Sequence, residues 1–480
     1  MWNQPRPQVS LRTLRLAPLA AVMLLAACAP LQTRQSLQAA NALTQPHTGQ
    51  AVQLLRDAAQ QQNAQAQIDA LLAKPLSADD AVRIALLGSP ALQALIAQAQ
   101  ADSAASTGFA RLSNPAFGFE RLLQGGGVEI TRALSFGLLD LLTLPGRSRI
   151  DAARQEQIRL ALSRDVLRTA AQARTAWVRA VAARQTAAYD RDVEDAAQAT
   201  ATLAERMRQA GNFTRLDAAQ QALFAADSRL RSSRAELAAT QTREALVRAL
   251  GLAPEQAARL TLPTQLPQAP QQPRATPSPA LQTALDTRLD VQLARADYTT
   301  EAQAAGLARN TSLIDHVELG AVRKTFSDAT PQNGFFLALS LPVFDVGDAR
   351  RSAAADRVLA ARNRTVATAQ NAASQLREAD ALLHRAWQQQ DISRRQVVPL
   401  AQTVLDESQL RYNGMLIGVF QLVLAASAQA QAVREAIAAQ RNYWLADAAW
   451  QAAQLGVDAG PSSAFDTAFA GAAAPSAAGH

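Results

Sequence analysis

Residues 147–250, which begin RSRIDAARQE and end REALVRAL, contain no proline and only one glycine, Gly211. A second stretch, residues 348–455, is interrupted only by Pro399, Gly414 and Gly418. Glycine and proline are the residues that most disfavour a helix interior, so each stretch predicts a long helix, a turn near the glycine and a shorter helix. Globular helices usually run about 8–20 residues, so helices of this length indicate an elongated body.

The two stretches follow one pattern. The glycine within the first stretch and the two glycines that flank it each have a counterpart roughly 200 residues later, a spacing that indicates a duplicated unit. The pairs are Gly146 and Gly347, Gly211 and Gly414, and Gly251 and Gly456. The 480 residues could hold two or more domains, but the duplication favours one elongated body built twice. We predict a mainly α fold with a small β part, in which a helix–strand–strand–long helix–helix unit occurs twice.

Each half also has two strand candidates ahead of its long helix. They lie near 116–122 and 128–136 in the first half, and near 313–326 and 334–344 in the second. The alternation of apolar with polar or small residues is clear in 128–136, where Arg132 shares the apolar face. In 334–344 one face carries Phe335, Leu337, Leu339, Leu341 and Val343.

These strands suit a membrane. Strands of about 9–11 residues with one apolar face are typical of a transmembrane β-barrel, although a soluble two-sheet domain shows the same pattern. Four strands cannot close a barrel and a bilayer tolerates no open sheet edge, so a barrel requires several chains, and three would supply twelve strands. Aromatic residues that fit the interface girdles of a barrel are Phe117, Phe119, Phe136, Phe326, Phe335, Phe336 and Phe344.

The remaining segments complete the plan. Ser77, followed by Asp79 and Asp80, predicts a helix start, with a helix to about Arg111 that breaks at 88–90. A corresponding helix is expected at about 280–309, and the seven prolines of 253–280 predict a linker. The predicted divisions are a signal peptide (1–27), an N-terminal segment (28–75), a first repeat (76–252), a linker (253–280), a second repeat (281–457) and a disordered tail (458–480).

The N-terminus has the pattern of a targeting signal. Arg6, Arg12 and Arg15 precede a short apolar run, 16–27, that ends at Cys28, the only cysteine. The run is too short to span a bilayer and has the length of a signal-peptide core. Leu25-Ala26-Ala27-Cys28 resembles a bacterial lipoprotein signal, in which the cysteine becomes the first residue and carries lipid. Cys28 is therefore the predicted lipidation site.

Composition argues against other classes of protein. The net charge is a modest +7, and no basic block stands out, so nucleic-acid binding is not expected. Four widely separated histidines, a single cysteine and no phosphate-binding glycine loop leave no catalytic motif, metal-ligand set or cofactor site. We predict a protein that is not an enzyme and binds no cofactor.

Several short motifs, in order and duplicated, resemble the TolC-like outer-membrane efflux factors over roughly residues 76–457. They are LSADDA at 76–81, Asn114-Pro115, LPVFD at 341–345, RYNGMLIGVF at 411–420, and the Leu-Gly endings at 250–251 and 455–456. The first hairpin and Pro145-Gly146-Arg147 look most like the branch of the family that serves heavy-metal and cation exporters.

The resemblance implies a homotrimer. Twelve strands would form one barrel through the outer membrane, and the long helices a tube across the periplasm. A periplasmic adaptor and an inner-membrane efflux pump would be the partners, with lipid on Cys28 anchoring each chain to the outer membrane. The chain would then be a passive exit duct for small solutes or metal cations. A secretion duct for polypeptides and a pore-less periplasmic scaffold lipoprotein remain the alternatives.

In this family the two helical turns form the periplasmic tip of the tube, where the adaptor docks and the pore narrows. The corresponding docking residues here are Gly211, Asn212, Thr214, Arg215, Gly414 and Gly418, and the candidate gate residues are Asp217, Arg411, Tyr412 and Gln421. Gly211 and Gly414 are expected to let the chain reverse. Many relatives carry acidic residues after the second turn, whereas this chain has Gln421 and Leu424 there, so an acidic ring could come only from Asp217.

Overall fold

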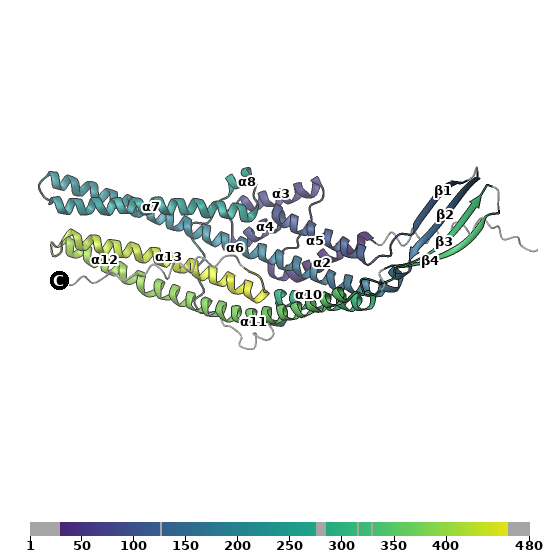
Figure 1. Cartoon of the computed structure of the whole chain (residues 1–480). Helices are drawn as coiled ribbons and strands as arrows, with labels where there is room; N and C mark the ends of the chain where they lie inside the picture. The colour runs from purple at the N-terminus through teal and green to yellow at the C-terminus, as the bar shows by residue number, and fades with distance from the viewer. Residues whose placement is uncertain (1–28, 125–126, 275–284, 314–315, 328–329, 459–480) are drawn as a thin grey trace, which may run out of the picture. The chain divides into compact units, whose positions relative to one another are not determined.

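A computed structural model describes residues 29–124, 127–274, 285–313, 316–327 and 330–458. The predicted signal peptide with Cys28 and the tail from 459 onward lie outside the described residues. The described residues form two compact units: one lies within 29–43, 96–162 and 296–362, the other within 44–95, 163–295 and 363–458. The long helices α6 (Leu138–Gln209) and α11 (Asp348–Ile392), labelled in Figure 1, each have residues in both units.

From residue 78 onward the described elements follow the predicted order in each half, whereas three further helices, at 29–48, 58–72 and 254–259, were not predicted. The first half contains α2 (Ala29–Thr48), α3 (Ala58–Leu72), α4 (Ala78–Gly88), α5 (Pro90–Phe109), β1 (Ala116–Gln124), β2 (Gly127–Gly137), α7 (Arg215–Leu250) and α8 (Pro254–Arg259). The second contains α10 (Leu289–Thr311), β3 (Val317–Phe326), β4 (Gln332–Leu339), a π-helical turn (Ser393–Val397), α12 (Val398–Asn413) and α13 (Val419–Leu455).

The four strands form one antiparallel sheet in the order β1-β2-β3-β4 (Figure 1). The two hairpins of the two repeats meet at β2 and β3, where Arg132 lies opposite Arg323 and Ser135 opposite Gly320. Within the described part of the chain, the outer strands β1 and β4 each have one edge without a partner strand. The sheet is therefore an open, four-stranded antiparallel meander.

The strands of the second half are shorter than predicted. β3 begins at Val317, not 313, and β4 ends at Leu339, not 344. The amide of Ser340 still donates to the carbonyl of His316, at 3.2 Å, but Pro342 has no amide to donate, and Val343 bonds back to Leu341 at 2.9 Å. Leu341 and Val343 consequently lie outside the sheet, although both stay exposed.

The first long helix starts earlier than expected, at Leu138 instead of after Gly146. Asp140 in its first turn accepts a hydrogen bond from Arg147 at 2.9 Å, and an acidic residue is favourable at a helix N-terminus. The helix thus continues through Pro145, which costs one backbone hydrogen bond. Gly146 leaves room for Leu307 of α10, whose Cδ1 would lie 3.1 Å from an added Cβ.

The second long helix continues without a loop from α11 into α12, but its hydrogen-bond pattern changes between them. At its π-helical turn, Ser393–Val397, the amide of Val398 donates to the carbonyl of Ser393, five residues earlier. The next residue is Pro399, which has no amide, so the wide turn falls where the α-helical ladder loses a donor.

The proline-rich segment predicted as a linker is packed onto helices over its described part. Three tryptophan or glutamine side chains hold it: Trp387 donates to the carbonyl of Pro270 at 3.0 Å, while Trp444 and Gln440 donate to that of Pro267, both at 2.8 Å. Ala269 enters a buried cluster with Leu383, Ala386, Tyr443, Ala446 and Trp450. The helix predicted from about 280 is interrupted: residues 285–287 are helical, Arg288 is not, and α10 starts at Leu289, while residues 275–284 lie outside the described part.

The start of α10 is fixed by a fully buried arginine. Arg288, 1% exposed, donates to Asp290 at 2.7 Å, to Gln375 of α11 at 2.9 Å and to the carbonyl of Ala453 in α13 at 2.6 Å. The end of α13 also lies against the start of α10. Gly456, which follows α13, has φ +70°, and a Cβ there would collide with the Asp290 carboxylate. A buried charge is tolerated because its donors are satisfied.

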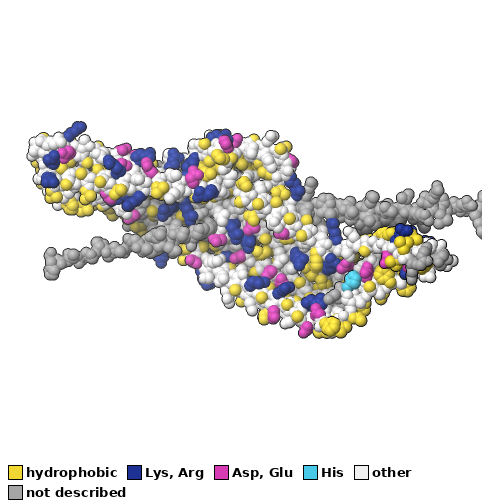
Figure 2. Space-filling view, turned by 45° about the horizontal axis from the view of Figure 1, so that its top comes forward, with side chains coloured by type: hydrophobic (Ala, Val, Ile, Leu, Met, Phe, Trp, Pro, Cys, Tyr) yellow, Lys and Arg dark blue, Asp and Glu magenta, His cyan; other side chains and the backbone are white. Residues whose placement is uncertain are grey.

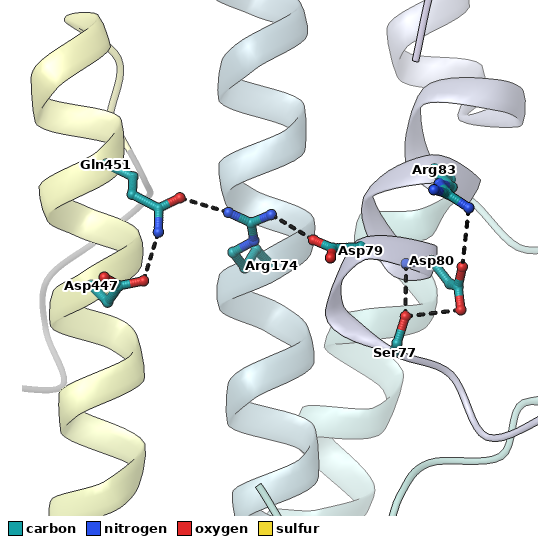
Figure 3. Close-up of polar contacts among 7 residues, drawn as sticks. All are labelled: Ser77, Asp79, Asp80, Arg83, Arg174, Asp447 and Gln451. Atoms are coloured by element: carbon teal, nitrogen blue, oxygen red, sulfur yellow. Dashed lines mark hydrogen bonds and ion pairs between the residues drawn. The ribbon is translucent and has the colours of Figure 1, made fainter. Parts of the chain in front are cut away.

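A chain of polar contacts joins α4, α6 and α13 (Figure 3). Arg174 of α6 donates to Asp79 at 2.8 Å and to Gln451 at 2.7 Å, and Gln451 donates to Asp447 at 2.6 Å. Arg274 also contacts Asp447, at 2.7 Å. Burial raises the pKa of Asp447 and outweighs Arg274, Gln451 and Arg174, which all lower it.

None of the described helices is by itself long and apolar enough to cross a membrane, whereas α4 and α5, bent by 49° at their junction, meet that length and composition test as a pair.

Candidate functional site at the helical tips

The first turn joins α6 to α7 through a left-handed glycine. Gly211 has φ +78°, and the amide of Asn212 donates to the carbonyl of Met207 at 2.9 Å, which closes the end of α6. Thr214 then caps α7: its hydroxyl accepts the amide of Asp217 at 3.1 Å, and the Asp217 carboxylate accepts the amide of Thr214 at 3.3 Å. This reciprocal capping box sets where α7 begins.

The second turn uses a different residue at the reversal. Gly414 has φ −80°, in the range open to every residue, and the left-handed position is taken by Met415, with φ +56°. The amide of Leu416 donates to the carbonyl of Arg411 at 2.8 Å, as Asn212 does to Met207 in the first turn. The expectation that Gly414 allows the reversal is therefore wrong. The prediction paired Gly211 with Gly414 because both are glycines, but the structural equivalent of Gly211 is Met415.

With this correction the two turns match residue by residue. Gly418 takes the place of Thr214, and its amide donates to the Gln421 side chain at 3.2 Å, as that of Thr214 donates to Asp217. Asp217 and Gln421, both predicted as gate residues, are therefore the capping residues of α7 and α13. The backbone at the start of α7 is capped by two acceptor side chains, Thr214 and Asp217, and that at the start of α13 by one, Gln421.

The remaining predicted residues are distributed around the turns. Asn212, Arg215 and Arg411 are exposed, and the Arg411 carbonyl is used in the turn. Tyr412 is half-buried and lines a cavity of about 380 Å³ between the two hairpins. The cavity is lined mostly by apolar side chains and holds no charged one; its walls include Leu203, Met207, Phe213, Phe224, Leu405, Val419, Leu422 and Val423. Of the four gate candidates, Tyr412 alone lines it.

The charges at the tips are mostly basic. Arg206, Arg208, Arg215 and Arg411 lie in or beside the turns, with Glu205 and Asp217 as the acidic residues. Hydrogen bonds from Arg208, at 2.6 Å, and Gln209 hold the pKa of Glu205 at about 2, so this carboxylate stays ionised and paired. The Asp217 carboxylate is engaged in its own cap, where it accepts hydrogen bonds from the neutral amide and hydroxyl of Thr214 and keeps its charge.

Sequence reasoning missed a set of exposed leucines on α7. Leu216, Leu223, Leu230 and Leu237 recur every seven residues and are 56–70% exposed. The exposed small residues between them, Ala219, Ala226 and Ser233, complete a repeat of the coiled-coil type. The opposite face of α7 is buried within the chain through Ala218, Gln221, Ala225, Ser228, Ser232 and Ala235. We call the exposed set the leucine seam; its seven-residue spacing is visible in the sequence.

No protein-family model and no curated protein matches the sequence. Solved structures do match. A membrane protein from Pseudomonas aeruginosa is 19% identical, with a TM-score of 0.66 over 78% of this chain and 93% of that one. The outer-membrane protein VceC of Vibrio cholerae is 17% identical, with a TM-score of 0.64 over 85% and 100%. The outer-membrane channel OprN is 17% identical, with a TM-score of 0.67 over 88% and 96%.

These neighbours define a class of fold, that of outer-membrane channel proteins. Within the class, the chain has the TolC-like fold, which confirms the mainly helical chain with a small antiparallel sheet that the sequence predicted. The match extends over more than nine tenths of each of the three neighbours.

Proposed function

We propose that the protein is the outer-membrane duct of a tripartite efflux system, a passive trimeric exit for small solutes or metal cations. One observation carries the proposal: a single chain joins an open sheet with an exposed apolar face to two helical hairpins. Phe117, Phe119 and Phe335 on that face are 60–84% exposed, and hydrophobic side chains gather over the sheet in Figure 2. A lipid bilayer is the environment that covers such a face.

The sheet edges support a trimer. Within the described residues, β1 and β4 each have an edge without a strand partner. Unpaired backbone N–H and C=O groups are unfavourable inside a bilayer, where no water can bind them. Pairing β1 of one chain with β4 of the next would close twelve strands in three copies. The TolC-like neighbours support the same assembly.

The leucine seam supports the trimer at the helices. Leucines at a seven-residue spacing with small residues between them fit knobs-into-holes packing against another helix. Because the other face of α7 is already buried within the chain, the seam is free to pack against a neighbouring copy.

We propose the two turns as the periplasmic tip, where an adaptor docks and an inner-membrane pump supplies the energy. The exposed Asn212, Arg215, Arg411 and Met415 offer a basic and partly apolar surface for such a partner. The lipid anchor at Cys28, and location in the outer membrane with a large periplasmic part, belong to the same proposal.

Reconstitution tests the proposal against a pore-less scaffold. The full-length protein, purified in detergent, should run as a trimer and give stepwise conductance in planar bilayers. Cys28→Ala, fused to a cleavable signal peptide, is the matched control and should still conduct, because the anchor is separate from the pore. A monomer that never conducts would overturn the proposal.

A further inference from the structure

The three arginines of the sheet lie on one face, and its three glutamates lie on the other. Side chains alternate along a strand, and directly paired residues share a face. By the register, Arg121, Arg132 and Arg323 lie on the face of Phe117, Leu134 and Phe335. The three glutamates of the strands, Glu120, Glu129 and Glu318, lie on the opposite face together with Lys324. The apolar face is therefore exclusively basic.

Among the residues that the structure describes, the arginines on the apolar face have no acidic partner. Arg132 and Arg323 are a directly opposed pair on β2 and β3, and both are exposed. Lys324 on the other face, by contrast, is paired with Glu129 at 2.8 Å. The Arg132 guanidinium donates to Thr325, at 3.5 Å, which offers it no negative charge. Like charges in directly opposed positions are unfavourable, so this pair gains stability from an anion shared between them.

The position of the arginines along the sheet indicates where such an anion comes from. On the helix side of Arg132 and Arg323 the exposed face is apolar, through Leu134, Phe136, Phe335, Leu337 and Leu339, and the band continues past the sheet at Leu341, Val343 and Phe344. On the turn side only Leu123, Val128 and Ile130 are large and apolar on this face. An arginine at the centre of a bilayer costs about 2–4 kcal/mol and near its surface about 0–1 kcal/mol. The arginines therefore belong at the headgroup level on the turn side.

We propose that Arg121, Arg132 and Arg323 form a binding site for the phosphate groups of a phosphorylated glycolipid in the outer leaflet. The planar guanidinium donates two parallel hydrogen bonds to a phosphate, and charge complementarity favours a doubly phosphorylated headgroup over a neutral one. The inference rests on the proposed outer-membrane location of the sheet.

The test compares lipids that differ only in phosphate. Native mass spectrometry of the full-length detergent-purified protein would measure retention of lipid A with two phosphates and of dephosphorylated lipid A. The wild type should retain the phosphorylated form about tenfold better, as expected for one or two charged hydrogen bonds. Arg132→Gln/Arg323→Gln should lose this preference, and Arg132→Lys/Arg323→Lys should keep part of it because the charge remains.

Two controls make the outcome specific. Lys324→Gln, on the same strand as Arg323 but on the opposite face, should keep the preference. If the glutamine variant fails to assemble, salt titration of the wild type replaces it, since retention of the phosphorylated lipid should fall as salt rises. Equal retention of both lipids by the wild type, or the same loss in Lys324→Gln, overturns the inference. A wild type that gives no conductance in neutral bilayers overturns the duct instead, so the two failures are distinguishable.

Discussion

Met415 occupies in the second turn the left-handed backbone position that Gly211 occupies in the first, with φ +56° against +78°. The hydrogen bonds that close the two helices match as well, from Asn212 to Met207 and from Leu416 to Arg411. Glycine adopts this conformation readily, whereas a residue with a Cβ is strained by roughly 1–2 kcal/mol. The second turn is held by its neighbours against the preference of its own residue.

This relationship predicts opposite effects of one substitution in the two turns. Gly211→Ala should loosen the first turn by about 1 kcal/mol, because a Cβ is unfavourable at φ +78° even though the space around it is empty. Gly414→Ala should be neutral or slightly stabilising, because φ is −80° and the nearest atom to a new Cβ is 3.5 Å away. The hydrogen-exchange rates of the Asn212 and Leu416 amides measure the stability of the first and second turns, respectively. Faster exchange of Leu416 in Gly414→Ala would contradict the correction.

Gln421 offers a test of ion selectivity at the tip. Gln421→Asp copies Asp217 in the first repeat, whose carboxylate caps Thr214, so the variant should fold and keep the start of α13. If Gln421 faces the pore, three new carboxylates should shift planar-bilayer selectivity toward cations by about twofold or more, an effect that weakens at high salt. Gln421→Glu is the matched variant and should shift selectivity in the same direction. Unchanged selectivity in both variants would remove Gln421 from the gate.

The leucine seam should be required for the trimer. Leu223→Glu/Leu230→Glu places two charges where a neighbouring helix is proposed to pack, and each lost leucine contact is worth about 1–2 kcal/mol. The trimer fraction measured by analytical ultracentrifugation in detergent should fall at least tenfold. Leu223→Met/Leu230→Met keeps the volume and apolar character and should assemble normally. A stable trimer of the glutamate variant would show that the seam lies outside the interface.

Asp447 predicts a pH dependence of stability. Burial raises its pKa in the folded chain, so the folded state holds this proton at pH values where the unfolded chain, with a pKa near 3.9, has released it. The contribution of Asp447 to stability therefore declines as the pH rises from about 4 through the folded pKa. Asp447→Asn abolishes this decline, so its Tm relative to wild type should increase between pH 4 and pH 7.

Gln451→Met is the companion variant. It keeps the acid but removes the hydrogen bond that lowers the Asp447 pKa, so its Tm should decline more steeply with rising pH than that of the wild type. A relative Tm of Asp447→Asn that falls as the pH rises would mean that attraction to Arg274, at 2.7 Å, outweighs burial.

The long helices and the strands could be predicted because each depends on a local pattern. The absence of helix breakers in 147–210 predicted most of α6, and two-residue alternation predicted β2 almost to the residue. The capping of α4 by Ser77 was also correct, since a cap depends on residues three positions apart. The duplicated order of elements followed from these local signals.

The features that were missed depend on contacts between distant segments. The sequence around Pro267 and Pro270 carries no signal that Trp444 and Trp387 donate hydrogen bonds to their carbonyls, so the segment was predicted as a linker. The left-handed Met415 was missed because glycine identity is the usual sequence signal for that conformation. The leucine seam has a local signal, seven-residue spacing, but its exposure is known only once the other face of α7 is seen to be buried.

The π-helical turn before Pro399 makes the side-chain surface of the second hairpin differ from that of the first, without a loop in the helix. A helix that widens for one turn takes up an additional residue and rotates every later side chain about the axis. α12 therefore does not continue the side-chain rows of α11, whereas α6 keeps one register up to the first turn. The two hairpins can in this way end at matching turns and still present different surfaces, so the proposed trimer would have a helical wall in which two kinds of surface alternate.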